Sequence, residues 1–569
     1  MVSALKRPMP WLLILQALCA YLAWPNYLLP ESNILSALLV FLVPMPTFMI
    51  MLRYQGREAY RWCGLSGLAM FLIPATLWFE MLPSFPLATP LIFLFLAAMV
   101  YGIFGNVGLW AGACIRRFPA WYLLFAPANF AAFEFLRLVL TPKIWFFPPP
   151  ILLYAYPLAG LPPLMQMASL TGVLGADYFV LCVAAGLALL AWRFLRAWDV
   201  RRPEPVLAGK VPAAEGRPLL VNSLMAAVLG LGFAALIVAG NLDAAKVERL
   251  QSQAERSLRP ALLQGQFDAG NYGEWSERIK QSAIVLFRRL ALNAKADRAE
   301  LLVFTESALP LTLPSTAKVW RDFQDILEEA GVPAIIGLVT ALDSERRFNV
   351  WYLVDAKGKI RDYYLKQYLI PFGEYMPGRP LVNGAIRLLN RVFATTYELL
   401  KLTSVDEDMK DLSPGSASKV FQLPQGAVIL RVCEEIMFPQ YFVQGVRLGG
   451  EVILNAGTGN WFPTPVFFNM RLQMACFRAV ETRRWVGLVS STASAAYVDP
   501  LGLVRDRAPF GQRAALVKRL PLLNGKTVYV RCGDWMGWLV LGLTAVLVAM
   551  MAWSWGRERF SKSGQERPA

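Results

Sequence analysis

Long apolar runs and mixed polar segments divide the chain into two kinds of region. Residues 10–240 hold a series of apolar runs, residues 241–534 have the mixed composition of a globular domain, and one last apolar run precedes a basic tail. Each run is close to the roughly 20 residues that an α-helix needs to cross a bilayer. We therefore predict eight membrane spans, near residues 10–29, 33–52, 62–82, 90–115, 119–140, 164–192, 218–240 and 535–555.

The positions of the basic residues orient these spans. Arginine and lysine gather at the N-terminus, in every second connection and in the C-terminal tail, whereas the intervening connections carry little charge. Cytoplasmic loops of membrane proteins show this bias. We expect a seven-span transmembrane bundle over residues 1–240, an extracytoplasmic catalytic domain over 241–534, and a final transmembrane helix with a basic cytoplasmic tail over 535–569.

The polar domain alternates between strand-like and helix-like segments. Its periodicity predicts helices over 274–294, 315–330 and 465–482, and strands over 301–304, 334–338, 350–354, 360–365, 427–432, 451–454 and 486–490. A turn at 355–358 joins two of these strands as a hairpin. Antiparallel hairpins mixed with covering helices favour an α/β sandwich over a single doubly wound sheet.

Composition limits the chemistry of this domain. The chain has 569 residues, 56% of them apolar, a net charge of +16 and no histidine. The absence of histidine excludes Ser-His-Asp and Cys-His catalysis and histidine-bound zinc, and we expect neither a metal nor a cofactor. Most of the basic excess lies in the cytoplasmic segments, so it reports membrane topology and does not indicate nucleic-acid binding.

Three polar residues stand where predicted strands end. Glu306 follows the strand at 301–304, Lys366 follows 360–365, and Cys433 follows 427–432. A thiol attacks as thiolate and needs a partner for its proton. A carboxylate can act as that base, and an ammonium can lower the pKa of the thiol and stabilise an oxyanion. Together the three residues predict an acyl-transfer site without imidazole.

Each of the three residues also has a structural interpretation. A free cysteine at a strand end is often a small buried apolar residue, and Cys433 could also form a disulfide with Cys476. Glu306 could cap the following turn, and Lys366 could pair with a surface carboxylate. These alternatives stay open for each residue taken alone.

Four motifs resemble those of one enzyme family. Residues 305–310 (TESALP), 364–367 (YLKQ) and 432–435 (VCEE) resemble the Glu, Lys and Cys motifs of the nitrilase (carbon–nitrogen hydrolase) superfamily. Residues 369–377 (LIPFGEYMP) resemble a loop of the bacterial apolipoprotein N-acyltransferases, which set a nitrilase-like domain between membrane spans. The similarity continues through Asn455, Trp461, Phe462 and residues 471–481, and in the membrane part through Glu134, Arg137 and residues 166–172.

The resemblance implies a four-layer αββα sandwich and a ping-pong reaction in the bacterial inner membrane, with the catalytic domain facing the periplasm. Cys433 would take an acyl chain from a phospholipid as a thioester and pass it to the N-terminal amine of a diacylglyceryl-cysteine lipoprotein. It also implies supporting roles for Glu374 and Glu435. Glu374 could hold Lys366 in place, and Glu435 could orient the amine or the thiol.

The chain departs from the family pattern near the nucleophile. Glu434 stands where the family usually has an aromatic residue, and a second carboxylate beside the thiol would raise the thiol pKa. Gly459 or Asn460 replaces an aspartate, and Asn469 and Arg471 replace histidines. Two alternatives therefore remain: a membrane-tethered amidase or ester hydrolase with the same three residues, and a catalytically inactive membrane-anchored binding module.

Two further segments bear on the membrane. Residues 380–402 alternate apolar and basic positions and could form an amphipathic flap at the interface, or an ordinary helix packed on the core. Glu134 and Arg137 lie three residues apart, so one helical face could pair them.

Overall fold

The structure is a computed structural model of the whole chain. It describes residues 8–80, 88–144, 149–199, 216–266, 277–306, 308–309, 317–341, 346–371, 373–376, 378–380, 384, 411–459 and 464–565. The amphipathic flap predicted over residues 380–402 falls almost entirely outside these ranges, as do Trp461 and Phe462.

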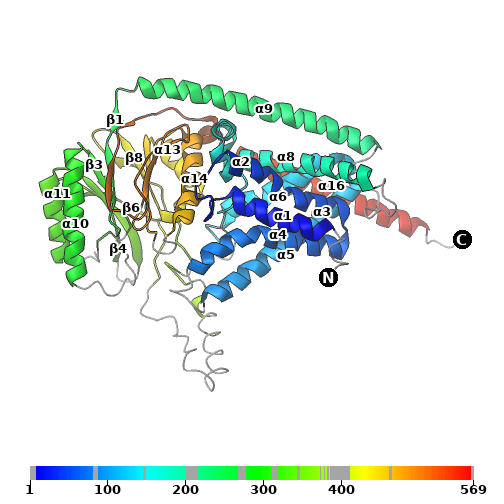
Figure 1. The fold of residues 1–569 in the computed structure, drawn as a ribbon, viewed down its shortest axis with the longest axis horizontal. Coiled ribbons are helices and arrows are strands. Elements are labelled where there is room, and N and C mark those ends of the chain that lie inside the picture. Colours follow the sequence, from blue (N-terminus) through cyan, green and yellow to red (C-terminus); the bar gives the residue numbers. More distant parts are fainter. Residues whose placement is uncertain are drawn as a thin grey trace, which may run out of the picture.

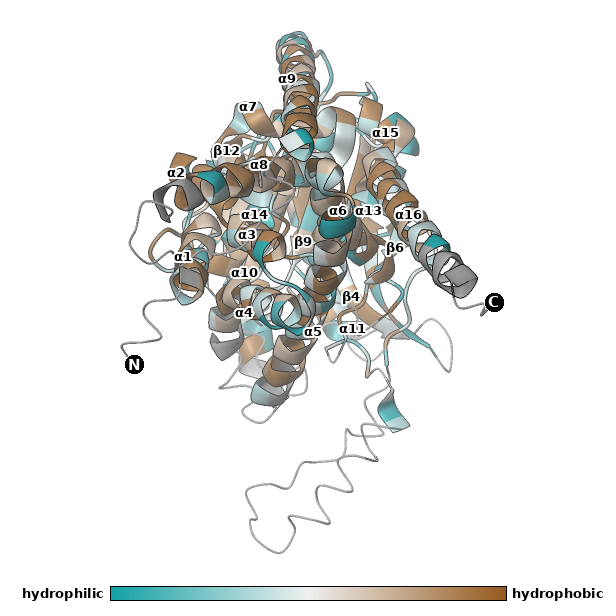
Figure 2. Ribbon diagram, turned by 90° about the vertical axis from the view of Figure 1, so that its right-hand side faces the viewer, coloured by the Kyte–Doolittle hydropathy of each residue, from teal (hydrophilic) through white to brown (hydrophobic). Residues whose placement is uncertain are grey.

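The apolar runs form a bundle of helices. Its members are α1 (Pro8–Ala23), α2 (Ile34–Leu39), α3 (Met45–Arg53), α4 (Gly56–Glu80), α5 (Ala88–Arg117), α6 (Tyr122–Leu140), α7 (Pro162–Met165), α8 (Ala168–Asp199), α9 (Gly216–Ser252) and α16 (Trp535–Gln565). Hydrophobic residues dominate these helices when they are viewed from the end of the bundle (Figure 2). Many large apolar side chains on α9 and α16 are exposed, among them Leu224, Leu231 and Trp538, as expected for surfaces that meet lipid.

Six helical segments in the described part of the chain are long and apolar enough to cross a membrane. They are 34–53, 93–117, 119–140, 168–195, 216–252 and 535–557, and each coincides with one of the eight predicted spans. Of the other two predicted spans, the first matches the shorter apolar helix α1 and the third lies on α4. These two stay predictions.

Helix α6 carries the predicted intramembrane pair. Arg137 Nη1 lies 2.5 Å from Glu134 Oε2, and Arg137 Nη2 donates to the carbonyl of Pro149. The spacing of three residues does place both side chains on one helical face.

The polar domain is built on two six-stranded sheets. The first has the order β13-β2-β3-β4-β5-β6 and the second β12-β11-β10-β9-β8-β7. The first contains β13 (Ala514–Val517), β2 (Pro260–Gln264), β3 (Leu301–Val303), β4 (Ala334–Ala341), β5 (Arg347–Val354) and β6 (Ile360–Leu365). The second contains β12 (Val504–Arg507), β11 (Ala495–Val498), β10 (Val486–Ser490), β9 (Val452–Gly457), β8 (Ala427–Val432) and β7 (Phe421–Gln422).

Both sheets mix parallel and antiparallel pairs in the same order. In the first, β2, β3 and β4 are parallel and β4–β5–β6 antiparallel. In the second, β8, β9 and β10 are parallel and β10–β11–β12 antiparallel. Parallel neighbours need helical crossovers and antiparallel neighbours need only turns. This is why the sequence shows helices only in the first part of each half.

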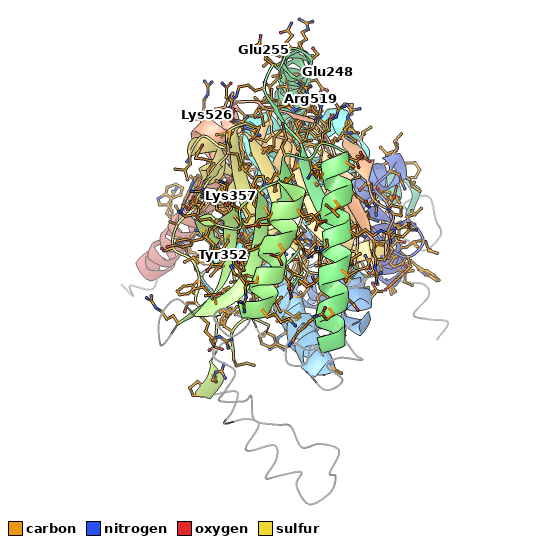
Figure 3. All side chains as sticks on the ribbon, turned by 90° about the vertical axis from the view of Figure 1, so that its left-hand side faces the viewer. Glu248, Glu255, Tyr352, Lys357, Arg519 and Lys526 are labelled. Atoms are coloured by element: carbon orange, nitrogen blue, oxygen red, sulfur yellow. The ribbon has the colours of Figure 1, made fainter. Side chains whose placement is uncertain are left out.

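Four layers result, and Figure 1 shows them in order. Helices α10 (Glu277–Ala296) and α11 (Ala317–Ala330) cover the outer face of the first sheet, and α13 (Pro439–Arg447) and α14 (Pro465–Thr482) cover the second, on the side of the bundle. One apolar core lies under α10 and α11, and another, containing Leu262, Leu454 and Cys433, lies between the sheets. Figure 3 looks onto the outer helices α10 and α11. The predicted αββα sandwich carried by an α-helical membrane bundle is confirmed.

The αββα sandwich and the membrane bundle share one apolar core. Buried side chains of α14, such as Phe477 and Val480, belong to the same apolar cluster as Tyr156 of the bundle, whose ring packs edge-on against Phe477 with centroids 5.7 Å apart. Helix α9 continues without a break from its apolar part to Ser252, so residues 241–252 extend the preceding span. Glu248 and Glu255 are labelled near this end in Figure 3, and Arg519 Nη2 donates to the carbonyl of Ala254 at 3.4 Å.

One arginine joins the two parts directly. Arg483 follows α14 in the left-handed conformation (φ 51°) and is buried. Its guanidinium lies 2.8 Å from Asp243 Oδ2 on α9 and donates to Gln166 Oε1, also at 2.8 Å, and to the carbonyl of Gly240 at 3.2 Å. The contacts hold the end of α14 against two bundle segments.

Candidate active site

The three predicted residues come together between the two sheets. Glu306 follows β3 and Lys366 follows β6, both in the first sheet, whereas Cys433 follows β8 in the second. Lys366 Nζ lies 3.3 Å from Glu306 Oε1. Both residues shift the pKa of Cys433 through their charges, so the three groups share one buried site.

Lys366 is the cation of this site. It is 1% exposed and also lies 2.9 Å from Glu374 Oε2. Burial lowers the pKa of Lys366, but the neighbouring carboxylates Glu306 and Glu374 more than offset this and hold the pKa well above its usual value. Lys366 is therefore a fixed positive charge and not a proton acceptor at neutral pH. Its partners are the buried Glu306 and the partly buried Glu374, rather than an exposed surface carboxylate.

Asn349 organises the two carboxylates and was not identified from the sequence. Its Nδ2 donates to Glu306 Oε1 at 2.6 Å and to Glu374 Oε1 at 3.1 Å, while its Oδ1 accepts from Trp351 Nε1 at 3.0 Å. The other oxygen of Glu306, Oε2, accepts from the backbone of Thr458 at 3.2 Å. A signal was present, because an asparagine inside the buried strand β5 needs partners for its amide.

Cys433 occupies a constrained backbone position. It is 2% exposed and has φ 49°, in the left-handed region that costs a residue with a side chain about 1–3 kcal/mol. Its carbonyl accepts from Asn455 Nδ2 at 3.1 Å and from Arg471 Nη2 at 3.4 Å. These donors hold the turn Cys433–Met437 that follows β8 and fix the thiol in the space between the sheets.

The thiol is protonated in the resting site. Burial raises the pKa of Cys433 above its ordinary value, and the charges of Glu306 and Glu434 raise it further, while Lys366 and Arg471 oppose them. The sequence-based expectation that Lys366 lowers this pKa has the correct direction, but burial is the larger effect. Attack by the thiol therefore requires transfer of its proton to a base as the new bond forms.

Glu435 links the two sheets. Its Oε1 accepts from Tyr364 Oη at 2.8 Å and from the backbone of Gln367 at 2.7 Å, and its Oε2 accepts from the backbone of Val432 at 2.7 Å. It thus ties the segment that carries Lys366 to the segment that carries Cys433. These bonds involve both oxygens, so Glu435 holds the two segments together.

Glu434 and Arg471, two of the departures from the family pattern, lie side by side at the nucleophile. Cys433 Sγ is 3.7 Å from Glu434 Oε1, and Arg471 Nε is 3.6 Å from the same oxygen. Arg471 also donates to Asn455 Oδ1 at 2.8 Å. Burial raises the pKa of Glu434, and the neighbouring Arg471 and Lys366 oppose that change.

The other chemical expectations concern cysteines and metals. Cys433 and Cys476 are both free thiols, so they do not form the disulfide considered from the sequence. In the ranges that the structure describes, no group of three or more cysteine, aspartate or glutamate side chains is arranged to hold a metal ion.

Comparison with known proteins matches the same region. The carbon-nitrogen hydrolase family matches residues 261–520. The chain is 25% identical over 392 residues to a protein of Geobacter metallireducens named apolipoprotein N-acyltransferase, covering 68% of this chain and 67% of that protein. It is 26% identical over 509 residues to a protein of the same name from Azotobacter vinelandii, covering 87% of this chain and 78% of that one.

Among solved structures, an amidase from Nesterenkonia sp. aligns with a TM-score of 0.35 and 16% sequence identity, over 50% of this chain and 97% of that one. The family match spans both sheets from β2 to β14 (Leu520–Pro521), and the similarity to the Azotobacter protein extends beyond it into the membrane bundle. Residues 261–520 therefore match the carbon–nitrogen hydrolase family, and the chain is similar along most of its length to proteins named apolipoprotein N-acyltransferase.

Proposed function

We propose that this enzyme transfers an acyl chain from a phospholipid, through a thioester on Cys433, to the N-terminal amine of a diacylglyceryl-cysteine lipoprotein. The observation that carries the proposal is the buried constellation of Cys433, Glu306 and Lys366 in a domain whose core is continuous with a membrane bundle. The names of the relatives support N-acylation of lipoproteins.

The first half-reaction forms the thioester. Glu306 takes the thiol proton as Cys433 Sγ attacks the ester carbonyl of the phospholipid, and the ammonium of Lys366 faces the oxyanion that develops. Collapse of the tetrahedral intermediate breaks the ester C–O bond. Glu306 returns the proton to the leaving alkoxide, and a lysophospholipid departs.

The second half-reaction consumes the thioester. The lipoprotein amine attacks the thioester carbonyl and gives up a proton to Glu306, and Lys366 again faces the oxyanion. The C–S bond breaks, the proton returns to sulfur, and an amide is released. Because Glu306 accepts and donates in turn, one carboxylate serves both halves of the cycle.

Intact-protein mass spectrometry after exposure to phospholipid tests the first half. We expect the wild type, and not Cys433→Ala, to gain the mass of one acyl group less a hydrogen, and hydroxylamine to remove it. Adding a diacylated lipopeptide should then discharge the protein and yield a triacylated peptide. Release of free fatty acid alone would identify a hydrolase, and failure of the wild type to gain mass with any phospholipid would identify an inactive binding module.

We place the catalytic domain on the periplasmic side of the inner membrane. One exposed cysteine can be labelled to test this orientation. Of the seven cysteines, all free, Cys532 is exposed and the other six are buried. It ends α15 (Val528–Cys532), just before the last span. A membrane-impermeant maleimide should label intact spheroplasts at Cys532 and leave Cys532→Ser unlabelled. Labelling of Cys532 only after lysis would place the domain in the cytoplasm.

A further inference from the structure

The nucleophile has a second acidic neighbour that its own segment supplies. Glu434 Oε1, at 3.7 Å, accepts the hydrogen bond of the Cys433 thiol. The carboxylate is 12% exposed, so little water screens it. An uncompensated carboxylate at this distance would stabilise the proton on sulfur and oppose formation of the thiolate.

A buried arginine from another element meets that carboxylate. Arg471 lies on α14, is 1% exposed, and places Nε 3.6 Å from Glu434 Oε1. This Nε has no hydrogen-bond partner, whereas the Nη2 of the same group is bonded to Asn455 and to the carbonyl of Cys433. The guanidinium is held through Nη2, and its Nε lies beside the Glu434 carboxylate, so the positive charge of Arg471 offsets the negative charge of Glu434.

The other charged groups around the thiol form a separate cluster. Glu306 and Lys366 act on Cys433 from the first sheet, Glu374 pairs with Lys366, and Tyr368 lies near Glu434. Glu434 and Arg471 therefore form a second ion pair at the sulfur, distinct from the Glu306–Lys366 pair. Among the side chains described, Arg471 forms the ion pair with Glu434, while the charges of Lys366 and Glu306 act on it from the other cluster.

We infer that Glu434 and Arg471 act as one compensating pair at the nucleophile: Glu434 accepts the hydrogen bond of the resting thiol, and Arg471 is a positioning residue that neutralises Glu434 and holds the Cys433 carbonyl. The pair allows this chain to carry a carboxylate beside its nucleophile. The inference rests on Cys433 as the proposed nucleophile, but not on the acyl donor or acceptor.

The pH dependence of alkylation tests the pair without acyl transfer. Full-length protein in detergent, on a Cys532→Ser background, is treated with iodoacetamide, and modification of Cys433 is followed by peptide mass spectrometry. We expect Glu434→Gln to move the midpoint of the rate profile down by about one to three pH units, because a negative charge leaves and Arg471 remains. We expect Arg471→Gln to move it up.

The double variant separates compensation from independent effects. Glu434→Gln with Arg471→Gln should bring the midpoint back toward the wild type, since both charges leave together. Arg471→Lys should stay closer to the wild type than Arg471→Gln does. If the glutamine variant of Arg471 does not fold, Glu434→Gln and Arg471→Lys still decide the question.

Two outcomes would overturn the inference. One is a Glu434→Gln profile that is unchanged or moves up. The other is a double variant that behaves like Arg471→Gln alone, which would mean that the arginine acts only through the backbone. Neither outcome depends on whether the enzyme acylates lipoproteins. The proposed function and the inference about the Glu434–Arg471 pair can therefore be contradicted independently.

Discussion

Lys366 and Glu374 form a partly buried ion pair, with Lys366 Nζ 2.9 Å from Glu374 Oε2. The same oxygen of Glu374 accepts from the backbone of Ile370, also at 2.9 Å. Glu374 thus connects the Lys366 ammonium to the loop that follows β6.

We predict that Glu374→Gln slows thioester formation about 10- to 100-fold, because a charge-assisted contact of about 1.5–3 kcal/mol is lost and Lys366 shifts toward Glu306. Single-turnover mass spectrometry with phospholipid measures this rate. Glu329→Gln is the control, because Glu329 pairs with Arg288 in a half-exposed surface contact and should leave the rate within about twofold. An unchanged rate in Glu374→Gln would remove Glu374 from the site.

Gly457, at the end of β9, gives a test of packing around the nucleophile. A Cβ at this position would lie 2.9 Å from Arg471 Nη2 and 3.0 Å from the Cα of Cys433. We predict that Gly457→Ala displaces both, lowers stability by about 1–3 kcal/mol and reduces thioester formation at least tenfold. Gly525→Ala is the matched control, because nothing lies within 4 Å of its added Cβ. Equal behaviour of the two variants in thermal unfolding and acylation would contradict the prediction.

Glu481, near the end of α14, makes stability depend on pH. Burial raises the pKa of Glu481 to about 7, although Arg478 and the backbone N–H of Val173 oppose the change. A raised pKa means that the folded protein keeps a proton that the unfolded chain has lost above about pH 4.5. Stability from this group is therefore complete below pH 4.5 and is lost as the pH rises through 7, by about 3 kcal/mol at most.

We predict that the difference between the thermal midpoints at pH 5.5 and pH 7.5 is smaller in Glu481→Gln than in the wild type. Other titrating groups contribute equally to the pH-dependent change in thermal midpoint of the variant and of the wild type, so their contribution cancels when the two changes are compared. Glu328→Gln, on the exposed face of α11, serves as control and should keep the wild-type difference. A difference as large in Glu481→Gln as in the wild type would show that another group carries the pH dependence.

Local pattern was sufficient for much of the fold. The helix expected over 465–482 has those bounds in the structure, and the strands expected at 360–365, 427–432 and 486–490 do as well. The local sequence pattern of a long apolar or periodic segment is enough to predict its secondary structure. The short strands β11 to β14 and the strand β2 were not predicted. Their alternation is weak, and β2, β13 and β14 also pair with distant segments.

The candidate site was predictable in part for the same reason. Glu306, Lys366 and Cys433 were found because each follows a recognisable buried strand. Asn349 was missed because its place inside a buried strand indicates only that its amide needs partners, and not that two carboxylates supply them. The contact of Glu434 with Arg471 joins residues of two different elements, and only the folded arrangement of α14 against β8 brings them together.

The junction between domain and bundle gives the last prediction. Asp243 on α9 pairs with Arg483, which also bonds to Gln166 and Gly240. We predict that Asp243→Asn lowers stability by about 1 kcal/mol and slows transfer from phospholipid more than attack on a small soluble ester, because the sandwich moves relative to the membrane while its active site stays intact. Glu248→Gln, exposed on the same helix (Figure 3), should change neither rate. Equal slowing of both substrates in Asp243→Asn would place the effect inside the active site instead of at the junction.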